Sequence, residues 1–110
     1  MADVIRVVKG DEKPDIVLTL TDEATGGAID LSAASTSVSI KFRKQNSTTV
    51  LSTISTVKVG TGATGQVQFD FSGNVLDVDA GMYEGEVIIT FNTDVQTVYD
   101  LIRFRVRDSF

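Results

Sequence analysis

Hydrophobic and polar residues alternate with a period of two along much of this chain. In segments 38–42, 67–71 and 102–106, an apolar residue stands at every second position, with polar or charged residues between. Side chains of a β-strand point alternately to the two faces of a sheet, so this period predicts half-buried strands. No segment has the period of an amphipathic helix. The pattern therefore predicts an all-β protein.

Turn-forming residues divide the chain into about seven such segments, an organisation typical of a β-sandwich or a β-barrel. Gly, Asn, Asp and Ser cluster between the apolar stretches and favour turns. A brief paired segment is also expected around Ile29 and Leu31. The main strands are expected within residues 4–8, 16–21, 38–43, 49–59, 66–71, 83–91 and 102–107.

The composition is that of one compact domain formed by residues 1–110. Hydrophobic residues make up 42% of the chain and charged residues 23%, which is enough apolar surface to offset the entropy of ordering. A chain of this size buries roughly two-thirds of the surface that it exposes when unfolded. Residues 1–9 are expected to form an edge strand or an N-terminal arm for assembly.

The residue types that most active sites need are absent. The chain has no cysteine and no histidine, which removes disulfides, thiolate zinc sites, cysteine nucleophiles and the commonest general base. Carboxylates gather at residues 11–15, 22–23 and 77–79, but their spacing fits no calcium loop, so solvated loops are the better interpretation. We expect no enzymatic activity, no cofactor, no metal site and no small-molecule substrate.

Charge and hydropathy also narrow the range of partners. The net charge of −5 argues against nucleic acid, whose binding depends on neutralisation of phosphates by Lys and Arg. No apolar run reaches the length of a transmembrane helix, and the first residues lack the apolar run of a signal peptide. We therefore expect neither membrane insertion nor export by that route.

Arginines form a row in the last expected strand, although the chain as a whole is acidic. Arg103, Arg105 and Arg107 alternate with Ile102, Phe104 and Val106, so the arginines should point outward and the apolar residues inward. In one interpretation, this row belongs to a sheet whose neighbouring strands carry basic, acidic and basic outward residues in turn. The other residues of that arrangement are Lys41, Arg43, Glu84 and Glu86. The alternative is a basic face left free for binding.

A tyrosine stands just after a tight turn in "DAGMYEGEV", residues 79–87. Asp79, Gly81 and Tyr83 resemble the Asp-x-Gly-x-Tyr corner of immunoglobulin-like sandwiches, in which the tyrosine hydroxyl bonds to backbone a few residues upstream. Glycine can adopt backbone angles that other residues avoid, and a buried phenol needs a hydrogen-bond partner. We therefore expect Tyr83 to be buried, with its hydroxyl bonded near residues 77–80. Antibody-type domains have a cysteine two residues after this tyrosine, where this chain has Gly85.

A longer succession of motifs covers nearly the whole chain. "KGDEKPDIVLTLTDEATGGAIDLSAASTSVSIKFRK" is followed by "GQVQFDF" and then by "DAGMYEGEVIITFNTDVQTVYDLIRFRV". In order and spacing these segments resemble the immunoglobulin-like domain of bacteriophage upper baseplate and related tail proteins. The resemblance implies an immunoglobulin-like β-sandwich of about seven antiparallel strands.

The same resemblance implies a non-enzymatic structural protein of the phage virion, assembled in the host bacterial cytoplasm. It would act in the tail or baseplate through contacts with other virion proteins, copies of itself included. Capsid decoration is the alternative, and a carbohydrate- or receptor-binding module that uses loops 24–35 and 60–65 is a weaker one. Interface residues are expected in the two terminal strands, which could extend a neighbour's sheet, and at the last residue. They are Val4, Ile5, Arg6, Arg103, Arg105, Arg107 and Phe110.

Overall fold

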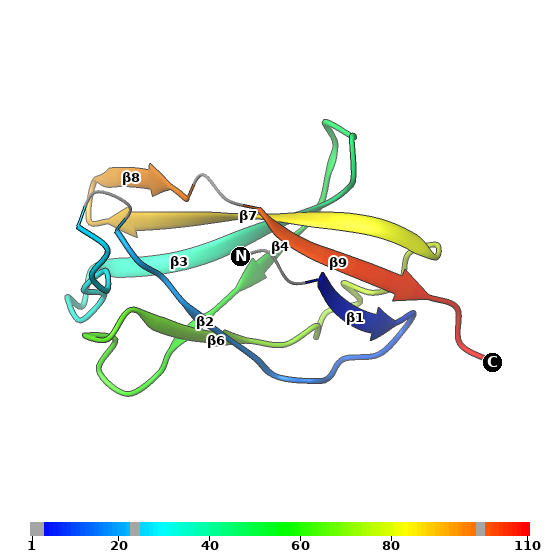
Figure 1. Ribbon diagram of the computed structural model, residues 1–110, viewed down its shortest axis with the longest axis horizontal. Helices are drawn as coiled ribbons and strands as arrows, with labels where there is room; N and C mark the ends of the chain where they lie inside the picture. The colour runs from blue at the N-terminus through cyan, green and yellow to red at the C-terminus, as the bar shows by residue number, and fades with distance from the viewer. Residues whose placement is uncertain (1–3, 23–24, 99–100) are drawn as a thin grey trace.

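The computed structural model describes residues 4–22, 25–98 and 101–110, and within these ranges it contains nine strands in two sheets and no helix. Figure 1 shows the two sheets as two layers, one above the other. The all-β prediction is therefore confirmed. The strands are β1 (Val4–Val8), β2 (Ile16–Thr19), β3 (Thr36–Lys44), β4 (Val50–Ser55), β5 (Val57–Lys58), β6 (Gln66–Phe69), β7 (Gly81–Phe91), β8 (Asp94–Thr97) and β9 (Ile102–Arg107).

The larger sheet has the strand order β1-β9-β7-β3-β4, and β8 pairs with β7 beyond the end of β9. The smaller sheet has the order β2-β6-β5. All pairings are antiparallel except that of β1 with β9, which is parallel. The structure thus has more strands than the seven expected, and one parallel pair where only antiparallel pairs were expected. A parallel pair is possible here because β1 and β9 are distant in sequence, so that no tight hairpin has to join them.

The expected strand at residues 49–59 is in fact two strands that belong to different sheets. β4 pairs with β3 in the larger sheet, whereas β5 pairs with β6 in the smaller one. Thr56 lies between them, and its hydroxyl donates a hydrogen bond of 2.8 Å to the Val38 carbonyl. The chain therefore crosses from one sheet to the other at this residue. A continuous run of β-branched residues carries no sign of such a crossing.

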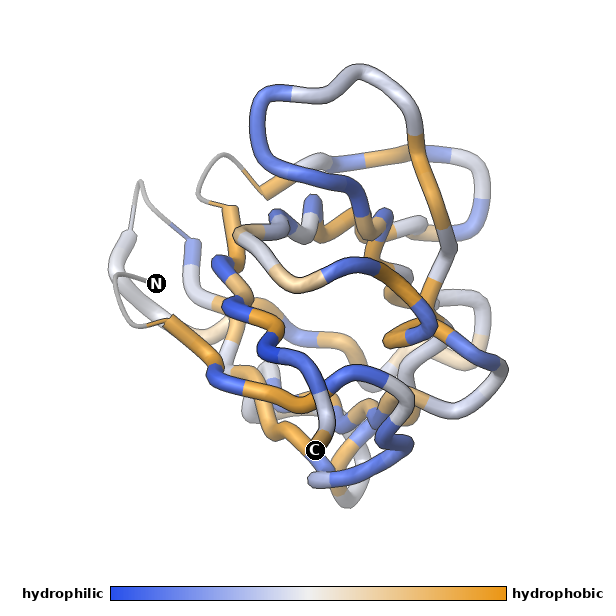
Figure 2. Tube along the Cα trace, turned by 90° about the vertical axis from the view of Figure 1, so that its right-hand side faces the viewer, coloured by the Kyte–Doolittle hydropathy of each residue, from blue (hydrophilic) through white to orange (hydrophobic). Residues whose placement is uncertain are grey.

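Side chains from both sheets form one hydrophobic core. Figure 2 shows hydrophobic and hydrophilic segments alternating along the chain, as expected for strands with one buried face. A chain of aromatic contacts runs through the core: Tyr83 stacks on Phe42 at 5.1 Å, and Phe42 contacts Phe104 at 5.3 Å. Phe104 in turn contacts Phe71 at 5.9 Å, and Phe71 contacts Phe69 of the smaller sheet at 5.7 Å. These rings connect the two sheets.

Candidate interaction surface

The corner at residues 79–83 holds the start of β7 in place. Tyr83 is buried, with 3% of its surface exposed, and its hydroxyl donates a hydrogen bond of 2.6 Å to the Asp79 carbonyl. This is the bond that the sequence predicts. Gly81 has a φ of 153°, a value that side-chain-bearing residues rarely adopt. Burial raises the pKa of the Tyr83 hydroxyl above its ordinary value, and the nearby Asp79 carboxylate raises it further. The hydroxyl of Tyr83 therefore serves to hold the corner together.

The arginine row of β9 points outward, as its spacing predicts. Arg103, Arg105 and Arg107 are exposed, whereas the alternating Ile102, Phe104 and Val106 are 1%, 0% and 2% exposed. β9 and β3 lie on either side of β7, again as predicted. Outward side chains of these three strands therefore share one face of the larger sheet.

The predicted alternation of charge holds over only part of this face. Arg43 of β3 forms an ion pair of 3.3 Å with Glu84 of β7, and Lys41 stands opposite Glu86. Arg103 is the next residue across from Glu84. Basic, acidic and basic residues thus follow one another across β3, β7 and the first half of β9. Lys41 and Arg43 therefore face acidic residues of the same sheet, as the structural interpretation predicts.

Beyond Arg103 the acidic strand no longer faces the arginines. The residue of β7 opposite Arg105 is Met82, and on the other side Arg105 is aligned with Arg6 of β1. Arg107 is aligned with Val8. None of the four arginines of β1 and β9 forms an ion pair with another described residue. The interpretation as alternating charge therefore applies to β3, β7 and the start of β9. The interpretation as a basic face applies to β1 and the rest of β9, where the arginines face no acidic residue among those described.

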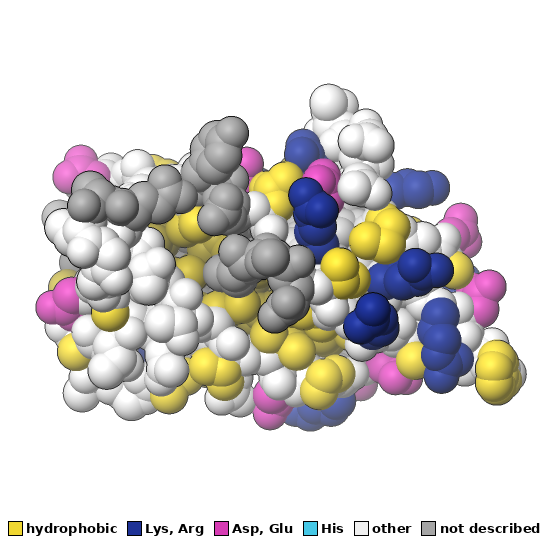
Figure 3. Space-filling view, viewed as in Figure 1, with side chains coloured by type: hydrophobic (Ala, Val, Ile, Leu, Met, Phe, Trp, Pro, Cys, Tyr) yellow, Lys and Arg dark blue, Asp and Glu magenta, His cyan; other side chains and the backbone are white. Residues whose placement is uncertain are grey.

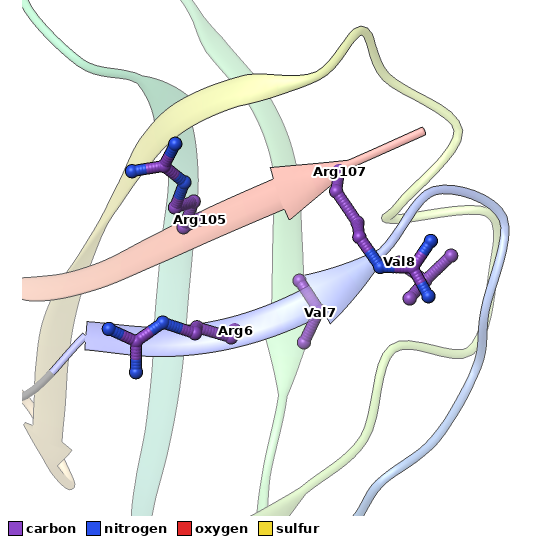
Figure 4. A pocket seen from close by; sticks show the side chains of 5 residues that line it. All are labelled: Arg6, Val7, Val8, Arg105 and Arg107. Atoms are coloured by element: carbon purple, nitrogen blue, oxygen red, sulfur yellow. The ribbon is translucent and has the colours of Figure 1, made fainter. Parts of the chain in front are cut away.

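This basic area, called the arginine patch below, consists of Arg6, Arg105 and Arg107. Figure 3 shows Lys and Arg side chains gathered on the half of the molecule where β1 and β9 lie. A hollow of about 220 Å³ is lined by Arg6, Val7 and Val8 of β1 and by Arg105 and Arg107 of β9. Figure 4 shows the Arg107 side chain running from the end of β9 toward Val8 at the end of β1. The sequence did not single out Val7 and Val8, because nothing distinguishes them from other valines until the two strands are aligned.

The backbone of β9 is not available to a partner. Residues 103–107 pair with β1 on one side, and residues 102–106 pair with β7 on the other. The expectation that β9 extends a neighbour's sheet is therefore wrong, because both of its edges are occupied within the domain. β1 is the last described strand on its side of the sheet, so its outer edge is the open one.

β1 is an integral strand of the domain. Val7 is buried in the core, and Ile5 packs against the core, so Ile5 faces inward and is not an outward interface residue. Val4 and Arg6 lie on the outward side. The first three residues of the expected N-terminal arm, 1–3, lie outside the described residues.

Phe110, an expected interface residue, is fully exposed at the end of the chain. The Arg107 guanidinium lies 5.1 Å from the centre of its ring and donates a hydrogen bond of 2.9 Å to the Asp108 carbonyl. Contacts with the chain end therefore hold Arg107 without neutralising its charge.

The two loops of the receptor-binding alternative pack against each other. The Leu31 amide donates a hydrogen bond of 2.9 Å to the Gly62 carbonyl, and Lys58 Nζ donates one of 2.7 Å to the Ala33 carbonyl. No aromatic residue occurs in either loop to stack on a sugar. Residue 24, the first of loop 24–35, lies outside the described residues. So does Glu23, which belongs to the carboxylates at residues 22–23.

The described parts of the chain contain neither a metal-binding cluster nor a membrane-spanning helix. No group of three or more carboxylates is arranged to hold a metal ion there. Nor do these residues include a helix long and apolar enough to span a membrane.

No protein-family model and no curated protein sequence matches this chain.

Proposed function

We propose that this chain is an immunoglobulin-like β-sandwich. The order β2-β6-β5 facing β1-β9-β7-β3-β4 supports this proposal, because it matches sheets of the type B-E-D and A′-G-F-C-C′. In that lettering β7 is strand F, and Tyr83 stands near its start with its hydroxyl bonded upstream. Both features belong to that fold.

We further propose that the protein is a non-enzymatic structural component of a bacteriophage virion, located in the tail or baseplate. The motif succession along the chain supports the phage role. The observation that carries the assembly role is the open outer edge of β1 beside the arginine patch. An open edge can pair with a strand of another protein through backbone hydrogen bonds, which require no catalytic side chain.

Electron microscopy of purified virions tests the location. Antibodies against the isolated chain would be bound to phage particles and located with gold labels. Label on the tail or baseplate is the expected result. Label distributed over the capsid shell would instead favour capsid decoration, and particles that lack the chain altogether would overturn the virion role.

A single substitution tests whether the edge of β1 is used. The Lys9 amide donates a hydrogen bond of 2.9 Å to the Arg107 carbonyl, so the N–H of Val8 points the other way, to the outer edge. Val8→Pro removes that outward donor and keeps the ladder to β9, whereas Val8→Ala changes the same side chain and keeps the donor. We expect normal incorporation of Val8→Ala and loss of incorporation of a folded Val8→Pro. Equal incorporation of both variants would show that this edge is not used.

A further inference from the structure

The arginine patch stands where a strand added to β1 would place its side chains. The outward residues of β1 are Val4, Arg6 and Val8, and the outward residues of β9 are aligned beside them. An added strand would lie about 4.8 Å from β1, with facing side chains roughly 5 Å from Arg6 and Val8. The Arg107 side chain extends toward Val8 and lines the same hollow, so its charge stands at the end of β1 where that strand would pair.

Arg6 and Val8 are two residues apart, which is one repeat of a strand. A partner strand with acidic residues at alternate positions would therefore present one carboxylate near Arg6 and the next near Arg107. Arg105, aligned with Arg6, adds charge at the first of these positions. Like charges on neighbouring strands repel, so Arg6 and Arg105 favour a partner that neutralises them.

The other described edge strands of this chain do not supply such a partner. β2, β4 and β5 contain no carboxylate, and β8 contains only Asp94. A second copy that paired through one of these strands would leave the arginine patch unneutralised. Nucleic acid is disfavoured because the chain as a whole is acidic, with a net charge of −5.

We propose that β1 accepts an extended segment of a different protein that carries Glu or Asp at every second position. This inference rests on the proposed assembly role and adds the chemistry of the partner. Backbone pairing along β1 supplies the affinity, and Arg6, Arg105 and Arg107 set the preference for an acidic strand. The open edge of β1, and the lack of ion pairs between these arginines and other described residues, are independent observations that indicate the same place.

The test is a titration of the isotope-labelled chain, followed by NMR, with three short blocked peptides. One alternates valine with glutamate, the second has glutamine in place of glutamate, and the third is the glutamate peptide N-methylated at alternate amides. The first should shift the amide signals of Arg6 and Val8. The glutamine peptide should bind roughly tenfold more weakly because it lacks the charge. The N-methylated peptide should not bind, since it cannot pair with the edge.

Variants of the chain locate the preference. Arg6→Gln and Arg107→Gln should each weaken binding of the glutamate peptide several-fold and leave the glutamine peptide unaffected. Lys44→Gln is the matched control, because it removes one exposed cation from β3, two strands away from β9. Added salt should weaken only the glutamate peptide.

Equal binding of the glutamate and glutamine peptides, or shifts confined to residues outside β1 and β9, would overturn the inference. Tighter binding of duplex DNA at the same arginines would also overturn it, in favour of a nucleic-acid surface. The location of the chain in particles is measured separately. A chain that is present in the tail but does not bind the glutamate peptide would refute this inference alone, whereas absence from particles would refute the virion role.

Discussion

Replacement of Tyr83 by Phe isolates the hydroxyl group of the corner. Phe keeps the aromatic ring, and with it the stacking on Phe42 at 5.1 Å, so core packing should change little. What is lost is the hydrogen bond of 2.6 Å to the Asp79 carbonyl. The substitution thus tests whether that bond stabilises the start of β7.

The size of the effect follows from the surroundings of the two partners. An intramolecular hydrogen bond contributes about 0.5–1.5 kcal/mol, and an acceptor left without water costs more. Asp79 is exposed, so water can reach its carbonyl when the hydroxyl is gone. We therefore expect a loss of about 1 kcal/mol in the free energy of unfolding, which is roughly 4 °C in Tm. Tyr83→Ala, which also removes the ring, should cost about 3–5 kcal/mol.

The same residue should make stability depend on pH in alkaline solution. Burial and the Asp79 charge raise the pKa of Tyr83 above its ordinary value, so the folded state holds this proton more tightly than the unfolded state. The resulting stabilisation is complete below the unfolded pKa and is lost as the pH rises through the folded pKa. Tyrosinate absorbance should show one of the two tyrosines of the chain titrating late, and Tyr83→Phe should abolish that step.

Urea unfolding followed by circular dichroism measures the loss, and Asp79→Asn is the control. This control keeps the backbone carbonyl and removes only an exposed carboxylate that lies 3.9 Å from Lys9, so it should alter stability by less than about 1 kcal/mol. If Tyr83→Phe is as stable as the parent chain and the late titration persists, the Tyr83 hydroxyl does not stabilise the start of β7.

Two further substitutions test packing and charge elsewhere. Gly85→Ala should destabilise the domain by about 1–3 kcal/mol in urea, because the added Cβ would lie 2.9 Å from Ile40 Cγ2 and 3.0 Å from Phe104 Cε2; unchanged stability would mean that the core has room there. Hydrogen bonds from Ser72 lower the pKa of the Asp70 carboxyl, so its contribution is present above the unfolded pKa and is lost as the pH falls through the folded value. Asp70→Asn should therefore unfold with a weaker acid dependence than the parent chain, and identical acid profiles would contradict this.

The strands with one fully buried face could be predicted from the sequence. In β3 and β9, polar and apolar residues alternate strictly, and a slip of one residue would bury charged side chains. β8 was missed because all four of its residues are exposed, and Val95 is 64% exposed, so burial leaves no pattern there. The crossing at Thr56 was missed because β-branched residues fit both sheets equally well.

Part of the interaction surface required the alignment of distant strands. The outward direction of the arginine row follows from its period of two alone. Whether its charges are neutralised depends on which residues stand beside them. Met82 lies on one side of Arg105 and Arg6 on the other, and no local pattern indicates that β1 pairs with β9 in parallel. The free basic area thus results from the way β9 is aligned with β1 and β7.

The core at Gly85 indicates how this domain holds its sheets together without a cross-link. In antibody-type domains the position two residues after the corner tyrosine holds a cysteine, and this chain has no cysteine at all. Because Gly85 has no side chain, Ile40 and Phe104 close over it from the strands on either side, β3 and β9. Phe104 also contacts Phe71, and Phe71 contacts Phe69 of the smaller sheet. The Phe71 amide donates a hydrogen bond of 2.9 Å to the Glu12 carbonyl. Packing across this point takes the place of a covalent bond, and stability should therefore be the same in oxidising and reducing solution.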